Sequence, residues 1–333
     1  MQRTDAGRVL VTGGTGFIGS HVIELLLRKG RPVTCLVRDP SRLRWLKDLD
    51  VTILQGDCLE PASLDRAVSG VAAVYHLAGL TKALHSRDYY TVNQTGTRNI
   101  LEACKRSNPG IRKFVLMSSL AAAGPSQDGS PVTDAVTPRP VSDYGKSKLL
   151  AEQEALQFKD RLPIVILRPS AVYGPRDTDV FELFRWASKG FLIDISGGER
   201  FMSWCYVEDL AEALLLAGEK PVQSGTIYFV AENRTYTTTE FHQILQRTGG
   251  VTARIVKVPF WMGYTIGALS EAVGFIRGKA TIVNRQKVRE GVEKYWTCGL
   301  DKIQNDLGFR SRFSLEVGLK KTWKWYRENS WIR

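Results

Sequence analysis

The feature that most constrains this chain is a glycine-rich turn near its start, between a strand-like run and a helix-like run. Residues 9–19 read VLVTGGTGFIG, which contains both G-x-G-x-x-G (Gly14, Gly16, Gly19) and G-x-x-G-x-x-G (Gly13, Gly16, Gly19). Glycines permit positive φ angles and let the backbone approach a ligand closely. The following helix offers free N–H groups and a positive dipole end to an anion. We therefore predict that this unit binds the pyrophosphate of a dinucleotide.

Short β-branched runs alternate with helical patterns through the first half of the chain. The expected strands cover residues 8–12, 32–37, 51–54, 72–77, 113–118, 164–167 and 226–230. This alternation produces βαβ units and a parallel sheet with helices on both faces. We expect an α/β fold with a doubly wound parallel (Rossmann) sheet and a smaller, mostly helical C-terminal domain that binds the substrate.

The length of 333 residues suggests two domains, since a typical domain has about 150 residues. Residues 1–175, with a return at about 204–232, are predicted to form the dinucleotide-binding domain. Residues 176–203 and 233–333 are predicted to form the substrate-binding domain. Residues 180–189 and 207–217 have helical patterns.

Charge and cysteine content narrow the class of protein. The net charge is +12, but Lys and Arg are dispersed except in residues 320–327 (KKTWKWYR). A dispersed basic surface favours an anionic cofactor over nucleic acid, which needs a clustered basic face. The five cysteines and four histidines show no metal-ligand spacing, and the N-terminus has no apolar leader. We therefore expect no metal, and reduced thiols in a cytoplasmic protein.

The residue type at the end of the second predicted strand indicates which dinucleotide, NAD or NADP, the chain binds. An acidic residue there would bind the ribose 2′-hydroxyl of NAD, whereas an arginine accommodates the 2′-phosphate of NADP. The sequence at this point has Arg38 followed by Asp39. Arg38 favours NADP, although Asp39 turned toward the ribose would suit NAD. Asp57, after the third strand, is expected at the adenine edge.

A tyrosine and a lysine one helical turn apart are the candidates for proton transfer. Tyr144 and Lys148 are four residues apart at the start of a predicted helix, so they share a face. An ammonium near a phenol lowers its pKa toward neutrality, which would make Tyr144 an acid/base for an alcohol or carbonyl oxygen. Ser119, at the end of a predicted parallel strand, can bind the same oxygen. A strand-end serine that only binds backbone is the alternative.

With these residues in place, further motifs give a family resemblance. They are TGGTGFIG (12–19), GD (56–57), HLAG (76–79), VNQTGT (92–97), SS (118–119), YGKSK (144–148), RPSAVYGP (168–175) and YVEDL (206–210). Their order over about residues 8–215 resembles the extended short-chain dehydrogenase/reductases of the NAD-dependent epimerase/dehydratase superfamily. The nearest likeness is to the branch of 3β-hydroxysteroid dehydrogenases and dihydroflavonol reductases.

The resemblance implies roles for individual residues. Tyr144 would be the acid/base, Lys148 would tune it and hold the nicotinamide ribose, and Ser119 would orient the substrate. Asn93 would support the active site or a proton-relay water. The cofactor, NADP in preference to NAD, would lie against Gly13, Thr15, Gly16, Phe17, Ile18, Gly19, Arg38, Asp57, Cys58, Leu77, Ala78, Gly79, Tyr144, Lys148, Pro169 and Val172. The family likeness also implies a homodimer.

Departures from family motifs narrow the substrate. Sugar 4,6-dehydratases carry Thr-Asp-Glu near the catalytic serine or threonine, but this chain has Ser118-Ser119-Leu120. Epimerases often have Asn-Asn-Leu after the Arg-Pro segment, whereas residues 177–184 read DTDVFELF. We therefore expect hydride exchange between nicotinamide and a secondary alcohol or ketone of a hydrophobic, steroid- or flavonoid-like molecule. The alternatives are a nucleotide-sugar 4-epimerase and a non-catalytic NADP-sensing regulator.

The second predicted domain is rich in aromatic residues. They include Phe184, Trp186, Phe191, Trp204, Phe260, Trp261 and Tyr264. These side chains can line an apolar substrate pocket, or they can be plain core. Residues 258–276 are apolar but contain Glu271 and three glycines, which indicates a helix over the pocket rather than a membrane span. Together with the basic, Trp-rich C-terminal run, this helix suggests a peripheral membrane contact.

Overall fold

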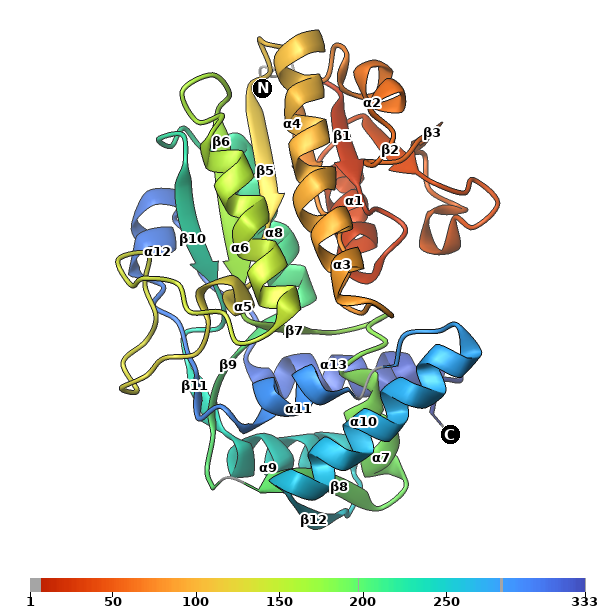
Figure 1. Cartoon of the computed structure of the whole chain (residues 1–333), viewed down its shortest axis with the longest axis vertical. Coiled ribbons are helices and arrows are strands. Elements are labelled where there is room, and N and C mark those ends of the chain that lie inside the picture. Colours follow the sequence, from red (N-terminus) through yellow and green to blue (C-terminus); the bar gives the residue numbers. More distant parts are fainter. Residues whose placement is uncertain (1–6, 197, 282–283, 333) are drawn as a thin grey trace.

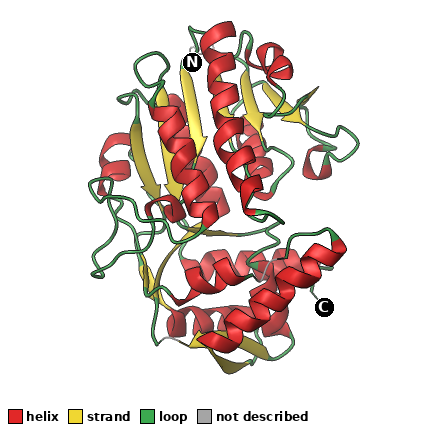
Figure 2. Cartoon of the chain, in the orientation of Figure 1, coloured by secondary structure: helices red, strands yellow, loops and turns green. Residues whose placement is uncertain are grey.

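The computed structural model describes residues 7–196, 198–281 and 284–332. Its largest element is a seven-stranded parallel sheet in the order β10-β6-β5-β4-β1-β2-β3. The strands are β1 (Val9–Thr12), β2 (Val33–Val37), β3 (Thr52–Gln55), β4 (Ala73–His76), β5 (Lys113–Met117), β6 (Ile164–Pro169) and β10 (Thr226–Val230). The order reverses between β1 and β4, which confirms the predicted doubly wound fold (Figure 2).

Helices cover both faces of this sheet (Figure 1). On one face lie α1 (Phe17–Arg28) and α8 (Val207–Glu219), and on the other α2 (Pro61–Val68), α4 (Gly96–Ser107) and α6 (Asp143–Leu156). Strand side chains alternate between the two cores: Val9 and Val11 join the first, and Leu10 joins the second. This burial on both faces explains why the strands are continuous apolar runs rather than alternating ones.

The carboxyl ends of the parallel strands meet at one edge of the sheet. The short elements that follow these ends are η1 (Arg44–Leu46), α3 (Ser86–Tyr89), η2 (Tyr90–Thr95) and α5 (Leu120–Ala123). The N-termini of α1 and α6 lie at the same edge. Ligands of open parallel sheets bind outside this edge, near the reversal of strand order.

A second, smaller group of elements lies beyond that edge (Figure 1). Its strands are β7 (Ala171–Tyr173), β8 (Phe191–Ser196), β9 (Phe201–Tyr206), β11 (Thr235–Thr237), β12 (Arg254–Pro259) and β13 (Tyr295–Trp296). Its helices are α7 (Phe181–Ser188), α9 (Thr238–Gly249), α10 (Phe260–Arg277), α11 (Arg285–Val292) and α13 (Leu315–Glu328). Phe184, Trp204, Trp323 and Tyr326 belong to its aromatic core. The C-terminal basic run therefore directs two of its aromatic side chains inward.

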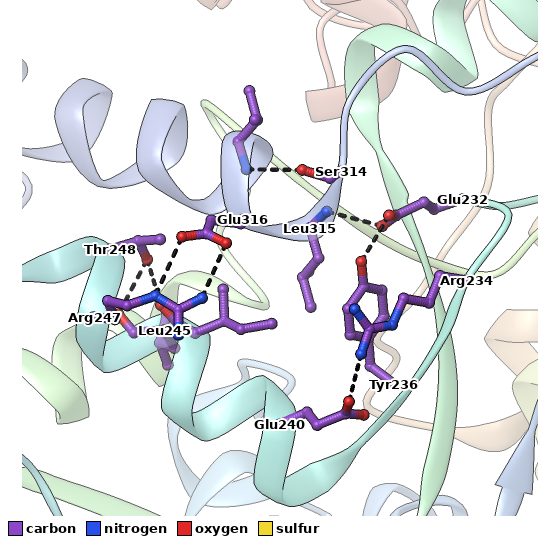
Figure 3. A network of polar contacts seen from close by, with 12 residues as sticks. Glu232, Arg234, Tyr236, Glu240, Leu245, Arg247, Thr248, Ser314, Leu315 and Glu316 are labelled. Atoms are coloured by element: carbon purple, nitrogen blue, oxygen red, sulfur yellow. Dashed lines mark hydrogen bonds and ion pairs between the residues drawn. The ribbon is translucent and has the colours of Figure 1, made fainter.

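Polar contacts connect the start of α13 to β11 and α9 (Figure 3). The Glu232 carboxylate accepts hydrogen bonds from the Tyr236 hydroxyl at 2.7 Å and from the Leu315 backbone N–H at 2.8 Å. Arg247 of α9 pairs with Glu316 of α13 at 2.9 Å.

Helix α12 (Asp301–Leu307) instead packs on the core of the large sheet through Ile303 and Leu307. The C-terminal third of the chain thus contributes to both cores, and the predicted domain division stays a prediction.

Three further observations concern the cysteines, membrane-spanning helices and metal sites. All five cysteines are free and buried. Among the described residues, none of the helices combines the length and apolar character needed to span a bilayer. Within the same residues, no group of three or more His, Cys, Asp or Glu side chains is arranged to hold a metal ion.

Candidate active site

The glycine turn after β1 is closed too tightly for side chains. Gly13 has a φ of +72°, and a Cβ there would lie 2.7 Å from the backbone nitrogen of Ala78. A Cβ on Gly19 would collide with the carbonyl oxygen of Gly13. Helix α1 begins at Phe17 with Gly16 as its N-cap and has no side-chain cap among the described residues. Its N-terminus is therefore suited to bind an anion through backbone N–H groups.

The ends of β2 and β3 carry the residues expected near the adenosine. Arg38 and Asp39 are both exposed. The Asp39 carboxylate accepts hydrogen bonds from the backbone N–H and the hydroxyl of Ser41, at 3.0 and 2.6 Å. One oxygen of Asp57 accepts the N–H of Leu59 at 2.9 Å. The Asp39 carboxylate is thus held by its own loop, whereas Arg38 extends to solvent.

Tyr144, Lys148 and Ser119 meet at the ends of β5 and α6. The Ser119 hydroxyl lies close enough to the Tyr144 phenol to act on its pKa. Ser119 also caps α5 by accepting the N–H of Ala121 at 3.1 Å, which fixes its hydroxyl. The Lys148 ammonium donates to the carbonyl of Met117 at 2.8 Å. Ser119 and Tyr144 therefore lie together at the carboxyl edge, and Lys148 is anchored on the last residue of β5.

Asn93 lies in η2, a turn of π-helix, near Ser119, Tyr144 and Lys148, which we call the triad. Its side chain accepts the N–H of Leu80 at 2.8 Å and donates to the Leu80 carbonyl at 3.1 Å and the Ser147 hydroxyl at 2.8 Å. A Cβ on Gly79 would lie 2.9 Å from the Asn93 oxygen and 3.2 Å from the Lys148 nitrogen. Asn93 thus ties the loop after β4 to α6. A residue larger than glycine at position 79 would crowd Asn93 and Lys148.

The electrostatics differ from the simple expectation for a tyrosine–lysine pair. Desolvation raises the pKa of Tyr144, although the nearby Lys287 cation and the hydrogen bond from Ser119 act to lower it. Burial lowers the pKa of Lys148 to about 8, and Glu152 partly opposes that shift. The expected fall of the Tyr144 pKa toward neutrality is therefore not found in the protein alone. The cation identified beside the phenol is Lys287.

Lys287 is a site residue that the sequence did not reveal. Its ammonium lies 5.6 Å from the centre of the Tyr144 ring and 2.8 Å from a carboxylate oxygen of Glu290. Across the same space, Lys82 pairs with Asp179. Lys287 belongs to α11, remote in sequence and outside any motif, so no local signal could have identified it.

Helix α11 also holds the N-terminus of the helix that carries Tyr144. The Ser142 hydroxyl, the N-cap of α6, donates to Glu290 at 2.5 Å. The Gln286 side chain accepts the N–H of Asp143 at 2.6 Å and donates to its carboxylate at 2.9 Å. The smaller group of elements, which we call the C-terminal lobe, therefore holds the start of the helix that carries Tyr144 and also covers Tyr144.

A cavity of about 430 Å³ lies between α10, α11 and the segment before α3. Its wall includes Tyr89, Tyr264 and Phe275. The Tyr89 ring of that wall lies 6.2 Å from the Tyr144 ring. Tyr89 therefore separates the cavity from Tyr144, which does not line it.

The aromatic residues predicted for such a pocket lie in three different places: the cavity wall, the core and the exposed surface. Tyr264 lines it, whereas Phe184 and Trp204 are core and Trp186, Phe191, Phe260 and Trp261 are exposed. For Phe184 and Trp204, the plain-core alternative is the one observed.

The remaining predicted cofactor residues lie near the carboxyl edge of the sheet. They are Thr15 and Ile18 in the glycine turn and α1, Cys58 after β3, Leu77 after β4, Pro169 at the end of β6 and Val172 in β7. The Ser170 hydroxyl, next to Pro169, is buried without a hydrogen-bond partner among the described residues. This unpartnered hydroxyl and the free backbone N–H groups at the N-terminus of α1 are the features of the edge that a dinucleotide would satisfy.

The comparisons with known proteins agree with this geometry. A family model described as "NAD dependent epimerase/dehydratase family" matches residues 9–231. The chain is 31% identical over 331 residues to a ceramide reductase of Caulobacter vibrioides, covering 99% of this chain and 98% of the relative. It is 28% identical over 355 residues to human 3 beta-hydroxysteroid dehydrogenase type 7, covering 95% and 94%.

A solved structure extends the likeness to the whole fold. The UDP-glucose 4-epimerase of Thermus thermophilus, in a complex with NAD, superposes with a TM-score of 0.78 at 26% identity, covering 96% of this chain and 99% of that one. The description of the family and that of this solved complex both name NAD, and the full-length relatives carry the names of enzymes. The chain is an NAD(P)-dependent enzyme that belongs to the NAD-dependent epimerase/dehydratase family, with the fold of the extended short-chain dehydrogenase/reductases.

Proposed function

We propose that this enzyme moves a hydride between a nicotinamide cofactor and a ketone or secondary alcohol of a hydrophobic substrate, with Tyr144 as the acid/base. The observation that carries the proposal is the proximity of the Ser119 and Tyr144 hydroxyls, with Lys148 one turn further along the same helix face. This arrangement gives a substrate oxygen two hydroxyl partners. General acid catalysis needs such geometry before it needs a particular pKa.

Each residue of the site has a separate task. In the reduction, the Tyr144 hydroxyl gives its proton to the carbonyl oxygen while Ser119 holds that oxygen. The bound dinucleotide supplies the hydride to the carbonyl carbon, so that C=O becomes CH–OH. Lys148, anchored on the Met117 carbonyl, is placed to hold the cofactor ribose. Asn93 keeps the loop after β4 against α6 and thereby keeps these groups in register.

The raised pKa of Tyr144 favours the neutral phenol, which suits a proton donor in the direction of reduction. Lys287 opposes that rise. We infer that Lys287 keeps the phenol close enough to ionisation to give up its proton. Reduction of a ketone is therefore the direction that the protein's own charges support.

The substrate class follows from the cavity and from the named relatives. The cavity wall presents three aromatic side chains, Tyr89, Tyr264 and Phe275, to an apolar body, and its other residues are mostly polar. The ceramide reductase and the 3 beta-hydroxysteroid dehydrogenase carry names of lipid substrates. We propose a lipid ketone, with an acyl chain or a ring system, in place of a sugar nucleotide.

NADP is the proposed cofactor. The Asp39 carboxylate is engaged by Ser41, and the neighbouring Arg42 lies 3.2 Å from it. Arg38 therefore remains the group available to a 2′-phosphate. We expect a higher kcat/KM with NADPH than with NADH, and Arg38→Ala should reduce this preference by about tenfold, the effect of one charge-assisted contact.

One screen tests the proposal. The protein is incubated with NADPH or NADH and a panel of 3-keto lipids, ketosteroids, flavanonols and UDP-glucose, and cofactor absorbance and products are followed. Turnover of a hydrophobic ketone that Tyr144→Phe abolishes supports the proposal. Turnover or micromolar binding of UDP-glucose alone would instead indicate an epimerase. Cofactor binding without turnover, unchanged in the variant, would indicate a regulator.

A further inference from the structure

Helix α10 packs against the protein with its smallest residues and exposes its largest. Its buried positions are three glycines: Gly263, Gly267 and Gly274. Trp261, Leu269 and Ile276 are 67%, 63% and 86% exposed. Helices of water-soluble proteins direct their large apolar side chains inward. The outward face of α10 is therefore not explained by the packing of this chain.

The exposed apolar surface continues onto the two-stranded sheet beneath α10. The Ile195 side chain of β8 lies within 3.5 Å of where a Cβ on Gly263 would be, so that face of the strand meets the helix. Phe191 and Ile193 share this face by the period of two, and both are nearly half exposed. Val256 of β12 is paired with Ile193 and is 38% exposed. We call the outward side of α10 with these three sheet residues the α10 face.

The α10 face is larger than a scatter of surface residues. Besides those named, its exposed side chains are Phe260, Met262, Ile266 and Val273. Contiguous apolar patches of this kind on a soluble protein mark an interaction site. Figure 1 shows α10 lying along the outer side of the smaller lobe, with no described element covering it.

The charges around the α10 face are mainly basic. Arg254 shares the face of Val256 on β12. Arg277 and Lys279 follow at the end of α10, and all three basic residues are exposed. The helix itself contains one acidic residue. That residue, Glu271, is already paired with Arg285 at 2.7 Å. A basic rim around an apolar helix matches an anionic lipid surface, where lysine and arginine bind headgroups and the apolar side enters the acyl boundary.

We propose that the α10 face docks this enzyme on an anionic bilayer surface, with α10 lying in the plane of the membrane. A second copy of the chain fits less well, because a two-fold interface would bring the basic rim against itself. The C-terminal basic run also fits less well, because Trp323 and Tyr326 are 1% and 0% exposed and serve the core.

The docking surface adjoins the cavity of the candidate active site. Tyr264, Glu271, Gly274 and Phe275 of α10 line that cavity from the inner side of the helix. A substrate that resides in the bilayer can then reach the cavity along the edge of α10. This second step rests on the proposed function, whereas the docking does not.

Flotation of the full chain with lipid vesicles tests the docking. Wild type should float with phosphatidylglycerol/phosphatidylcholine vesicles and much less with phosphatidylcholine alone. The triple variant Trp261→Ser/Leu269→Ser/Ile276→Ser should lose about tenfold or more of its partitioning, since three large side chains no longer insert. The matched control is Val136→Ser/Val317→Ser, whose targets are 48% and 47% exposed elsewhere on the molecule.

Charge variants separate the proposed rim from the C-terminal run. Arg277→Gln/Lys279→Gln should weaken binding to the anionic vesicles by about thirtyfold at low salt, given roughly 1 kcal/mol for each of the two charges. Lys320→Gln/Lys324→Gln on α13 should leave it unchanged. Circular dichroism verifies that each variant is folded, and the surface positions make this the expected result.

Three results would overturn the docking proposal. They are no flotation of the wild type, equal flotation of the triple variant, and a solution dimer that the triple variant dissociates. The link to catalysis has its own readout. If the proposed function holds, the triple variant loses turnover of a ketolipid in vesicles but keeps turnover of a short, water-soluble ketone. Failure of the proposed function removes both activities from wild type while flotation persists.

Discussion

Helix α1, taken with the glycine turn before it, and helix α10 both combine apolar residues with glycines, and they use the two residue types in opposite ways. In α1 the glycines stand at the N-terminus, where they leave backbone N–H groups for an anion, and Ile23 and Leu26 are buried in the core. In α10 the glycines form the buried side, and Leu269 and Ile276 face outward. Similar composition thus produces a core helix in one region and an exposed face in the other.

The difference teaches that pattern, and not composition, decides what a helix does. In α1 the apolar residues are spaced at three and four, so burial follows from the sequence. In α10 large apolar residues occur on nearly every side, and only the side that carries the glycines can approach the protein closely. Because a glycine brings two backbones close, the glycine stripe becomes the packing side and the large residues remain outside.

The largest expected effect concerns the catalytic edge beside α1. Tyr144→Phe removes the proton donor while keeping the ring, so kcat should fall by about 10²–10⁴-fold. Steady-state rates on the best substrate of the screen give the measurement, with cofactor binding followed by fluorescence. Tyr228→Phe is the control. Tyr228 lies on β10, the edge strand of the sheet, and its hydroxyl donates to Asp306 of α12. Equal loss in both variants would mean that the effect is structural.

A matched pair of leucines tests the comparison of the two helices directly. Leu26 of α1 is 1% exposed and Leu269 of α10 is 63% exposed. Leu26→Ala should lower the free energy of unfolding by about 2–5 kcal/mol, through lost burial and the cavity left behind. Leu269→Ala should change it by less than about 0.5 kcal/mol. Urea denaturation without lipid measures both values.

A large loss for Leu269→Ala would contradict the outward orientation of α10. In that case the α10 face would be buried in solution, and the inference of a membrane surface would lose its basis. A small loss for Leu26→Ala would contradict the assignment of α1 to the core.

The glycines of α10 give a smaller and more specific contrast. A Cβ on Gly267 would lie 3.0 Å from the backbone of residues 284 and 285, whereas the nearest atom to one on Gly263 is an Ile195 methyl group at 3.5 Å. Gly267→Ala should therefore destabilise by about 1–3 kcal/mol, because the neighbour is backbone that cannot move aside. Gly263→Ala should stabilise by up to about 1 kcal/mol through helix propensity.

Thermal and urea denaturation of the two glycine variants decides between packing and propensity. Equal stabilisation by both would show that α10 does not approach the start of α11 as closely as described. The lipid-binding assay should follow the same order, since only Gly267→Ala disturbs the seat of the helix.

Much of the large sheet and the triad could be predicted from sequence because their signals are local. Strand runs, the glycine turn and the spacing of Tyr144 and Lys148 each lie within a short window, and the parallel topology brings strand ends together. Lys287 could not be predicted in this way. Its place beside Tyr144 depends on how α11 returns across the site, which is set by packing of the whole C-terminal lobe.

The orientation of apolar residues in the C-terminal lobe was equally out of reach. Phe184 and Trp261 have similar local sequence signals, yet the first is fully buried and the second is exposed. What separates them is the glycine stripe of α10 and the aromatic core built on Trp323 and Tyr326. The electrostatic sign at Tyr144 also needed the structure, because burial outweighs the effect of a nearby cation.

The last prediction concerns pH and tests the role of the buried lysine at the carboxyl edge. Burial lowers the pKa of Lys148 to about 8, whereas an unfolded lysine keeps its proton to about pH 10.4. If Lys148 acts as a cation, kcat/KM should fall above pH 8, approaching about tenfold for each pH unit. Between pH 8 and about 10.4 the unfolded chain binds more protons at this residue, so its contribution to the free energy of unfolding rises with pH.

Activity and stability should therefore move in opposite directions over the same pH range. The stability term is isolated as the difference between wild type and Lys148→Met, measured by urea denaturation at each pH. Other titrating groups, the buried cysteines included, contribute to both proteins and cancel in that difference. A stability difference that is flat between pH 8 and 10 would show that Lys148 is not desolvated in solution. The fall in activity would then have to be assigned to another group, with Tyr144 the next to test.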